Sequence, residues 1–141
     1  MKKLLALAGM LLATNGFAGQ LTDYNQIKSA VMNGESIRIA TDFNKCIGKG
    51  NESPKYSLGV FSPESIYVYA DGTIKTALKN FTLNDRNVPG KPVYQYVVYT
   101  INPDNTVRVS MYVMDAANYT MITKNEGNMC DLADGAKVYT G

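Results

Sequence analysis

The most regular feature of the chain is a two-residue alternation of apolar and polar side chains, which begins near residue 56 and continues almost to the end. It is clearest in residues 106–114, where one face carries Val107, Val109, Met111 and Val113 and the other carries Arg108, Ser110 and Tyr112. A period of two is that of a β-strand with one buried face and one solvated face. The pattern therefore predicts antiparallel strands over a single core.

Turn residues divide this region into hairpins. Asp71-Gly72 and the Asn-Pro-Asp-Asn run at 102–105 are typical of tight turns, because Gly and Asn accept backbone conformations that other residues resist. A polar bend is expected at 125–128. The predicted strands are 56–61, 65–70, 74–83, 93–101, 106–114, 119–123 and 136–139.

The first part of the chain changes period. Apolar side chains in residues 21–33 recur at helical spacing, Thr22 or Asp23 can cap the N-terminus, and Asn33-Gly34 ends the helix. A short strand is expected at 36–40 and a Gly/Pro-rich loop at 48–55. The predicted fold is mainly β, an antiparallel sandwich or small barrel of about 7–8 strands with one N-terminal helix, and α+β is the alternative.

Residues 1–18 have the three parts of a cleavable export signal. Lys2 and Lys3 precede the short apolar run 4–13, and Gly16-Phe17-Ala18 provides the small residues that a signal peptidase requires. The run is too short to span a membrane, which takes about 20 residues. We expect cleavage after Ala18, a periplasmic or secreted location, and a single mature domain, 19–141, without a membrane span.

Removal of that segment changes the charge. The full chain has 14 basic and 12 acidic side chains, a net charge of +2. Lys2 and Lys3 leave with the signal and no acidic residue does, so the mature domain has no net charge. A nucleic-acid partner is therefore not expected.

Two cysteines, Cys46 and Cys130, are present. An exported protein meets an oxidising compartment, so an even number of cysteines favours a disulfide. Closing a loop of about 85 residues is worth about 4–5 kcal/mol on the chain-entropy model. Two buried free thiols are the alternative, whereas a redox-active pair is usually Cys-x-x-Cys.

Missing residue types exclude much enzyme chemistry. The chain contains no His, which removes Ser-His-Asp and Cys-His catalysis and His-ligated zinc, and two cysteines alone cannot build a structural zinc site. No Gly-rich phosphate loop is present. We therefore expect no metal and no cofactor. Candidates for an Asp/Glu-dependent hydrolase are Asp71, Asp85, Asp104 and Asp115, although such residues in turns ordinarily bind the backbone.

Four of the ten tyrosines form a candidate surface for a partner or ligand. Tyr67 and Tyr69 share a face of one strand, and Tyr94 and Tyr96 share a face of another, with Tyr99 on the opposite face. Tyr has an apolar ring and a polar tip, which suits a binding surface. It also suits an ordinary half-buried strand, and this second interpretation is favoured by composition alone.

The order of several short stretches resembles the VirK family of small exported bacterial proteins. They are the helix with Gly34 and the strand to Cys46, residues 69–74, 81–83 and 90–96, Tyr99, residues 102–107, Cys130, and residues 135–139. The resemblance covers essentially all of 19–141 and rests on order and spacing. Asn105 stands where the family pattern leads us to expect Gly, and Asn tolerates the left-handed conformation of such a turn.

The resemblance implies a periplasmic or secreted protein, allows a link to virulence or host association, and supplies no catalytic residue. We therefore expect a small exported, non-enzymatic β protein that binds a protein or a component of an envelope or host surface. A small-ligand carrier, with the strands closed into a barrel, is the alternative, and an Asp/Glu-dependent hydrolase is a third.

Overall fold

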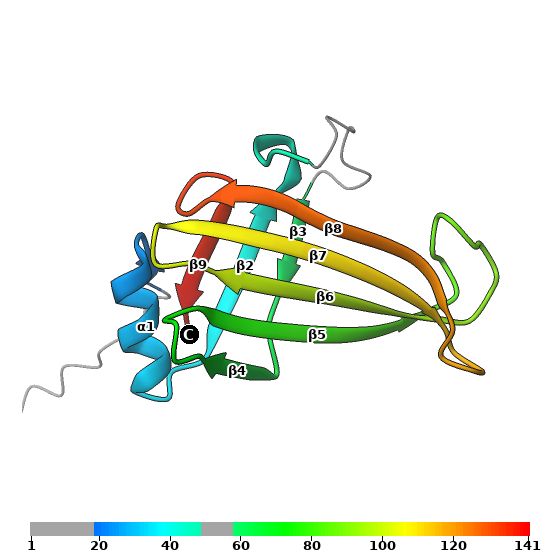
Figure 1. Cartoon of the computed structure of the whole chain (residues 1–141), viewed down its shortest axis with the longest axis horizontal. Coiled ribbons are helices and arrows are strands. Elements are labelled where there is room, and N and C mark those ends of the chain that lie inside the picture. Colours follow the sequence, from blue (N-terminus) through cyan, green and yellow to red (C-terminus); the bar gives the residue numbers. More distant parts are fainter. Residues whose placement is uncertain (1–18, 49–57) are drawn as a thin grey trace, which may run out of the picture.

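The computed structural model describes residues 19–48 and 58–141. Five of its antiparallel strands form a meander in which each strand pairs with the next along the chain. They are β4 (Ser65–Val68), β5 (Ile74–Thr82), β6 (Val93–Ile101), β7 (Thr106–Asp115) and β8 (Met121–Asp131). The hairpin turns predicted at Asp71-Gly72 and 102–105 are confirmed. The long strands reach well beyond the second sheet at the end that is far from the helix (Figure 1).

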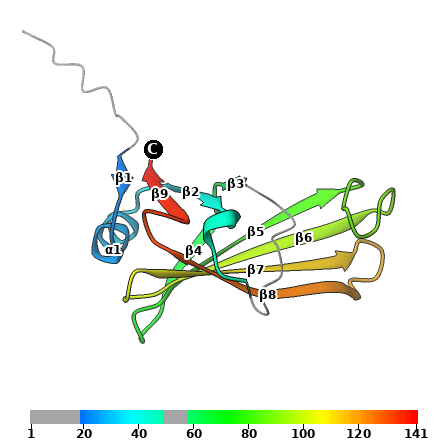
Figure 2. The ribbon, with the colours of Figure 1, turned by 90° about the horizontal axis from the view of Figure 1, so that it is seen from above.

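A second antiparallel sheet lies across one face of the meander (Figure 2). Its strands, in spatial order, are β1 (Gln20–Leu21), β9 (Ala136–Thr140), β2 (Ile37–Asp42) and β3 (Leu58–Phe61), and the 3-10 turn η1 (Phe43–Lys45) follows β2. The described strands thus form two open sheets. The predicted mainly β fold with one helix is confirmed, in the two-sheet form and not as a closed barrel.

The helix α1 (Tyr24–Met32) lies where the 3.6-residue pattern predicts it. Asp23 is the N-cap, and its side chain accepts a hydrogen bond from the backbone N–H of Gln26 at 3.0 Å. At the other end Gly34, at φ 77°, allows the N–H of Glu35 to reach the carbonyl of Ala30. This is a Schellman ending, which Gly favours because it has no Cβ.

Both hairpin turns dock on the start of α1. Asn105 adopts φ 64°, and its side-chain oxygen accepts a hydrogen bond from the N–H of Tyr24 at 2.8 Å. The hydroxyl of Tyr24 donates to the carbonyl of Gly72 in the neighbouring turn. Gly at position 105 would adopt the same backbone conformation but would leave that helix N–H without this acceptor. Asn105 therefore satisfies the turn and the helix together.

The core lies between the two sheets at the helix end. Ile37, Ile39 and Val138 from the smaller sheet meet Tyr99 and Ile101 from the meander, and all five are nearly inaccessible to water. Buried among them, Thr41 Oγ1 and Tyr99 Oη share a hydrogen bond of 3.1 Å. Burial raises the pKa of the Tyr99 hydroxyl, so Tyr99 remains neutral. Tyr99 is thus a core residue, on the opposite face from Tyr94 and Tyr96, as its spacing predicts.

In the last part of the chain the predicted strand 136–139 is confirmed as β9, but the predicted bend at 125–128 is wrong. In place of a short strand at 119–123 and a polar bend at 125–128, β8 is one strand of eleven residues. Its pairing with β7 shifts between Val109 and Ser110, where Gly127, at φ 112°, is the extra residue of a bulge. Because β8 is an edge strand, its polar side chains reach water. The polarity that predicted a bend belongs to a bulged edge strand.

Candidate functional site

The meander has one covered face and one open face. We call the side turned away from the smaller sheet the outer face; among the described residues no other strand or helix lies over it (Figures 1 and 2). Cross-strand pairing arranges its side chains in rows. From the helix end outward the rows are Lys75, Thr100 and Arg108; Ala77, Val98 and Ser110; Lys79, Tyr96 and Tyr112; and Phe81, Tyr94 and Met114.

All four tyrosines singled out from the sequence belong to this side of the meander. Tyr67 stands opposite Lys75 on β4 and is 63% exposed, and Tyr69 follows the strand and is 48% exposed. The ammonium of Lys75 lies 4.8 Å from the centre of the Tyr69 ring, within the range of a cation–π contact. Tyr94 and Tyr96 lie further along the face, so the two pairs of tyrosines are on the same surface but not in contact.

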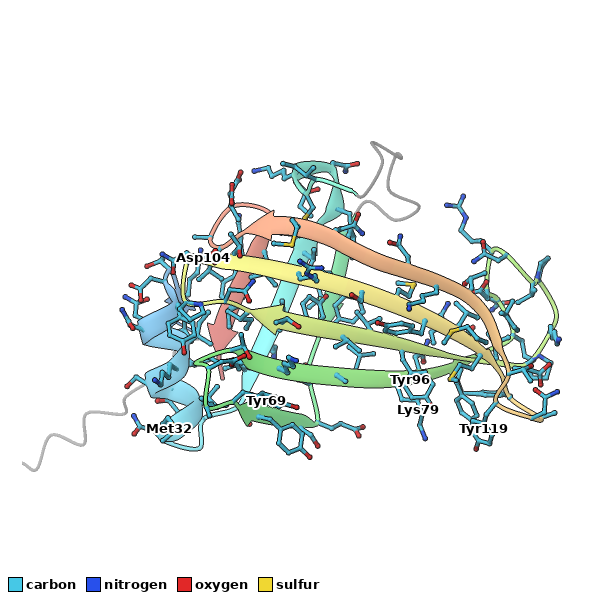
Figure 3. The ribbon with its side chains drawn as sticks, in the orientation of Figure 1. Met32, Tyr69, Lys79, Tyr96, Asp104 and Tyr119 are labelled. Atoms are coloured by element: carbon cyan, nitrogen blue, oxygen red, sulfur yellow. A yellow bond between two sulfur atoms is a disulfide. The ribbon has the colours of Figure 1, made fainter. Side chains whose placement is uncertain are left out.

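Tyr94 is the centre of an aromatic group at the far end of the meander. We call this group the tip cluster: Phe81, Tyr94, Tyr96 and Tyr119. The Tyr94 ring stacks on Tyr119 with centroids 5.7 Å apart, meets Phe81 edge-on at 5.6 Å and lies 6.4 Å from Tyr96. Lys79 places its ammonium 5.1 Å from the Tyr94 centroid. Figure 3 shows Lys79, Tyr96 and Tyr119 gathered at that end.

The backbone holds Tyr119 in an uncommon conformation to complete the tip cluster. Tyr119 has φ 59°, which is unfavourable for a bulky residue and costs of order 1 kcal/mol. A hydrogen bond of 2.9 Å from its N–H to the carbonyl of Asp115 fixes the turn. Phe81 and Tyr119 are 55% and 58% exposed, although they pack on Tyr94. The strained backbone at Tyr119 therefore holds its ring against Tyr94 while the ring remains exposed to solvent.

A hollow of about 580 Å³ separates the two ends of the outer face. We call it the outer hollow. Its lining includes Lys75, Thr100 and Arg108 from one row and Ser110 and Tyr112 from the next two. A second hollow, of about 510 Å³, opens between the sheets beside the edge strand β3 and includes Phe43, Leu78, Val97 and Met111. We call this one the inner hollow.

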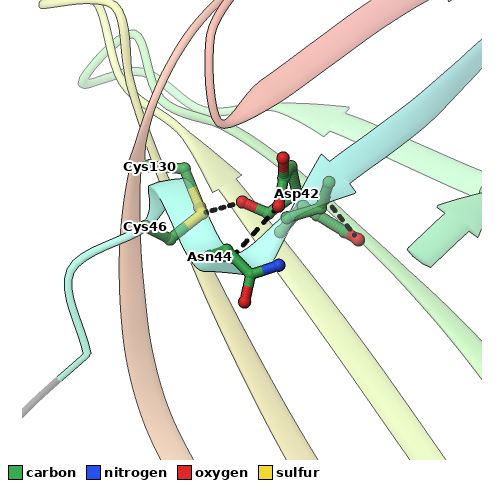
Figure 4. The surroundings of a disulfide bond; sticks show 6 residues. Asp42, Asn44, Cys46 and Cys130 are labelled. Atoms are coloured by element: carbon green, nitrogen blue, oxygen red, sulfur yellow. Dashed lines mark hydrogen bonds between the residues drawn. A yellow bond between two sulfur atoms is a disulfide. The ribbon is translucent and has the colours of Figure 1, made fainter. Parts of the chain in front are cut away.

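The disulfide joins Cys46 and Cys130, whose neighbours in sequence, Ile47 and Met129, line the outer hollow. Cys46 and Cys130 are bonded, with their Cα atoms 4.3 Å apart, as the sequence predicts (Figure 4). The bridge joins the segment after β2 to the end of β8 and so ties the two sheets together. Next to it Ile47, which lines the hollow, pairs with Met129 through backbone hydrogen bonds of 2.7 and 2.8 Å.

The four candidate carboxylates stand at opposite ends of the meander. Asp71 and Asp104 accept hydrogen bonds from Thr73 and Thr106 in the turns near α1, and those bonds lower the pKa of each carboxyl. At the other end Asp115 pairs with Lys91 at 2.7 Å, and its pKa is lowered by that contact first. Each of these three carboxylates is thus occupied in fixing its own turn or loop.

Asp85 is the buried member of the four. Burial by itself raises its pKa, but hydrogen bonds from the side chain of Gln95 at 2.8 Å and from the N–H and amide of Asn87 outweigh it, and the pKa lies below its usual value. Gln95 is on the inner side of β6. Through its hydrogen bond with Gln95, Asp85 therefore holds the loop between β5 and β6 against the far end of the inner face.

Four residues of the outer face were not predicted from the sequence: Phe81, Tyr119, Lys75 and Arg108. Phe81 could have been found, because alternation within the hairpin puts it on the same face as Lys79, opposite Tyr94. Tyr119 gave no usable signal, since its position depends on a positive φ in a turn that was predicted as strand. Among the described residues no group of three or more potential metal ligands is clustered.

The fold and the open face define a small two-sheet β protein with one helix and an exposed aromatic and cationic surface. The model of the VirK protein family matches residues 20–119, and the chain belongs to this family. It is 27% identical over 146 residues to "Uncharacterized protein y4wH" of Sinorhizobium fredii, covering 99% of both chains. Its fold is similar to the crystal structure of lpg1832, a VirK family protein from Legionella pneumophila, with a TM-score of 0.79 and 22% identity, over 86% of this chain and 98% of that one.

No helix in the described part of the chain combines the length and the apolar character that crossing a bilayer requires.

Proposed function

We propose that this protein is an exported, non-enzymatic binding protein that uses the outer face of its meander to hold a protein or a component of an envelope or host surface. The observation that carries the proposal is the tip cluster, in which Phe81 and Tyr119 pack on Tyr94 and stay exposed, and Tyr119 adopts a positive φ to do so. Aromatic side chains with few rotatable bonds supply large contact areas at low entropic cost, and they are enriched in binding surfaces.

Export is supported by the N-terminal pattern Lys2-Lys3, the apolar run and Gly16-Phe17-Ala18, and a disulfide is compatible with it. The test is the intact mass of the protein recovered from each cell fraction and from the medium. A species beginning at Gly19 outside the cytoplasm is the expected result. A full-length species confined to the cytoplasm would overturn this part of the proposal.

The binding role is tested by capture with matched variants. Phe81→Thr removes one exposed ring and keeps a residue that favours strands, while Tyr119→Asn removes the other and keeps a residue that tolerates positive φ. Met32→Ser, on the exposed side of α1 at 69% exposure, is the control. Immobilised mature protein should retain an envelope or host component that is lost with both tip variants and kept with Met32→Ser. Equal retention by all variants would count against this face.

A link to virulence or host association is part of the same proposal, supported by membership of the VirK family. A strain lacking the gene should grow normally alone and be impaired in association with its host. Restoring Tyr119→Asn should fail to complement, whereas restoring Met32→Ser should succeed. Complementation by the tip variant would separate the phenotype from the outer face.

A small-ligand carrier is a second candidate, and the inner hollow favours it. The hollow lies between the sheets with apolar side chains from both, including Phe43, Leu78 and Met111. Small-molecule sites are of this size and mostly apolar. Native mass spectrometry of protein purified from its own organism should then show a co-purifying small molecule that is lost on Leu78→Lys. Protein without added mass would end the carrier hypothesis.

A further inference from the structure

The outer hollow follows from the order of rows along the outer face. The row Ala77, Val98 and Ser110 has short side chains, and it lies between two rows of long ones. On one side stand Lys75 and Arg108, and on the other stand Lys79, Tyr96 and Tyr112. A row of short side chains between rows of long ones leaves a trough across the strands. The resulting volume, about 580 Å³, is within the range of small-molecule sites.

Two cations stand at one side of this trough. Lys75 and Arg108 occupy β5 and β7 in the same row, with Thr100 of β6 between them, so their Cα atoms are two strand spacings apart, about 10 Å. Neither forms an ion pair with a carboxylate of the described residues. Both side chains line the hollow, Lys75 from the side of Tyr69 and Arg108 from the side of Gly127, so each can offer its charge to an anionic group bound there.

The floor and walls of the hollow offer further hydrogen-bonding groups. Thr100, Ser110 and Tyr112 each contribute a hydroxyl-bearing side chain to the lining. A hydroxyl both donates and accepts, so such a lining suits a ligand that carries hydroxyl groups of its own.

The bulge in β8 positions the guanidinium. Gly127, the extra residue, has no side chain, and a Cβ there would meet Cγ, Cδ and Nη1 of Arg108 at 3.9–4.0 Å. The arginine side chain therefore lies along the bulge, and its direction is set by packing. Bulges are over-represented beside functional sites for this reason, because they re-aim a neighbouring side chain.

From these observations we infer that the outer hollow is a binding site for a small acidic ligand, one that presents a carboxylate or phosphate to Lys75 and Arg108 and hydroxyl groups to Thr100, Ser110 and Tyr112. An acidic sugar has this chemistry. The inference deepens the proposed function, since it rests on the outer face being the binding face and names the group that the hollow recognises on the partner.

The test uses small probes and the whole mature protein. Glucuronate supplies a carboxylate, glucose 6-phosphate supplies a phosphate, and glucose and glucosamine are the neutral and cationic counterparts. In NMR titrations of the backbone amides we expect saturable shifts at Thr100, Ser110 and Gly127 with one or both acidic probes, and none with glucose or glucosamine. The preferred acidic probe identifies the source of the anion. Equal shifts with glucose, or no saturable shift below about 10 mM of any acidic probe, would overturn the inference.

Matched charge variants separate this site from general surface charge. Arg108→Gln and Lys75→Gln should each weaken binding of the acidic probe about 10- to 100-fold, because each removes a charge-assisted hydrogen bond. Arg38→Gln on β2 and Lys28→Gln on α1 remove the same charges from exposed positions elsewhere and should leave it unchanged. A uniform loss in all four variants would indicate nonspecific attraction and contradict the site.

A variant of the tip cluster separates the hollow from the larger proposal. Phe81→Thr should leave the titration unchanged. If the acidic probe binds but capture of a macromolecule fails, the site in the hollow stands and the larger proposal is rejected. If capture succeeds but the acidic probe does not bind, only the site in the hollow is rejected.

Discussion

At the scale of single residues, positions that matter most combine two duties. Asn105 supplies both a left-handed turn and an acceptor for α1. Tyr119 accepts a strained backbone so that its ring can stack on Tyr94. Asp85 is buried, charged and hydrogen-bonded by two side chains at once. In each case a substitution that preserves one duty and removes the other tells them apart.

Gly135 packs directly against the disulfide. A Cβ at this position would come within 3.1 Å of Cys46 Sγ, 3.2 Å of Cys130 Cβ and 3.3 Å of the carbonyl of Lys45. These atoms are held by a covalent bridge and by backbone, so they cannot move aside cheaply. Gly135→Ala should lower the free energy of unfolding by about 1–3 kcal/mol, measured by urea denaturation.

Gly19→Ala is the control for this prediction. A Cβ there meets only the Thr140 hydroxyl at 3.6 Å, an ordinary van der Waals distance. Its effect on the urea midpoint should be small. If Gly135→Ala is as stable as Gly19→Ala, the atoms around the disulfide can move to accept a Cβ, contrary to this prediction.

The lowered pKa of Asp85 predicts that part of the stability of the folded protein is lost in acid. Its pKa in the folded protein lies below the unfolded value of 3.8, so the unfolded chain binds more protons and stability rises with pH across that interval. The stabilisation is present above the unfolded pKa and is lost as the pH falls through the folded pKa. Asp85→Asn should therefore be less stable than the native protein near pH 7, with a gap that narrows below about pH 4.

The comparison needs urea midpoints at several pH values for both proteins. Asp131→Asn, at an exposed carboxylate on β8, serves as the control for the loss of one negative charge. If the difference in urea midpoint between the native protein and Asp85→Asn stays constant from neutral to acid pH, the charge of Asp85 does not contribute to the pH dependence of stability.

At the scale of elements, α1 is stabilised by its ends as well as by its apolar stripe. Only Tyr24, Ile27 and Ala30 are fully buried among its nine residues, so caps contribute a large share. Asp23→Ala removes the N-cap bond to Gln26 and should cost about 1 kcal/mol. Asn25→Ala changes an exposed position in the first turn and should be neutral or slightly stabilising. Urea midpoints of the two variants measure the difference, and equal losses would contradict the cap's role.

Most elements could be predicted from the sequence because period and turn chemistry agree. The helix, both hairpins and the strand 93–101 all have a regular pattern bounded by Gly, Asn or Pro. β8 could not, since residues 125–128 read Asn-Glu-Gly-Asn and carry no apolar alternation. Its strand conformation is imposed by nine residue pairs with β7 and by the freedom of Gly127 to form a bulge.

The candidate site was only partly predictable for the same reason. Alternation placed Tyr67, Tyr94 and Tyr96 on one face correctly, because facing depends only on the period within a strand. The tip cluster and the outer hollow depend on cross-strand register and on the turn at Tyr119. Register is fixed by pairing across the whole meander, so it lies beyond what a single strand's pattern contains.

At the scale of the whole molecule, the disulfide is the covalent link between the two layers. Cys46 follows the smaller sheet and Cys130 ends β8, and 84 positions of sequence separate them. The intact mass of the oxidised protein should be two hydrogens below that of the reduced protein. Two alkylatable thiols under native, non-reducing conditions would refute the bridge.

Replacing both cysteines, Cys46→Ser with Cys130→Ser, should cost about 2–5 kcal/mol of unfolding free energy, since the cross-link restricts the unfolded chain. This double substitution should affect the outer hollow more than the tip cluster. Ile47, which borders the outer hollow, is held next to the bridge by its pairing with Met129, whereas the tip cluster lies at the far end of the meander. The double variant, assayed where it is still folded, should therefore bind the acidic probe more weakly than the native protein while tip-dependent capture is retained. Parallel loss of both activities, with an unchanged amide spectrum, would mean that the outer face acts as one unit and not as two separable sites.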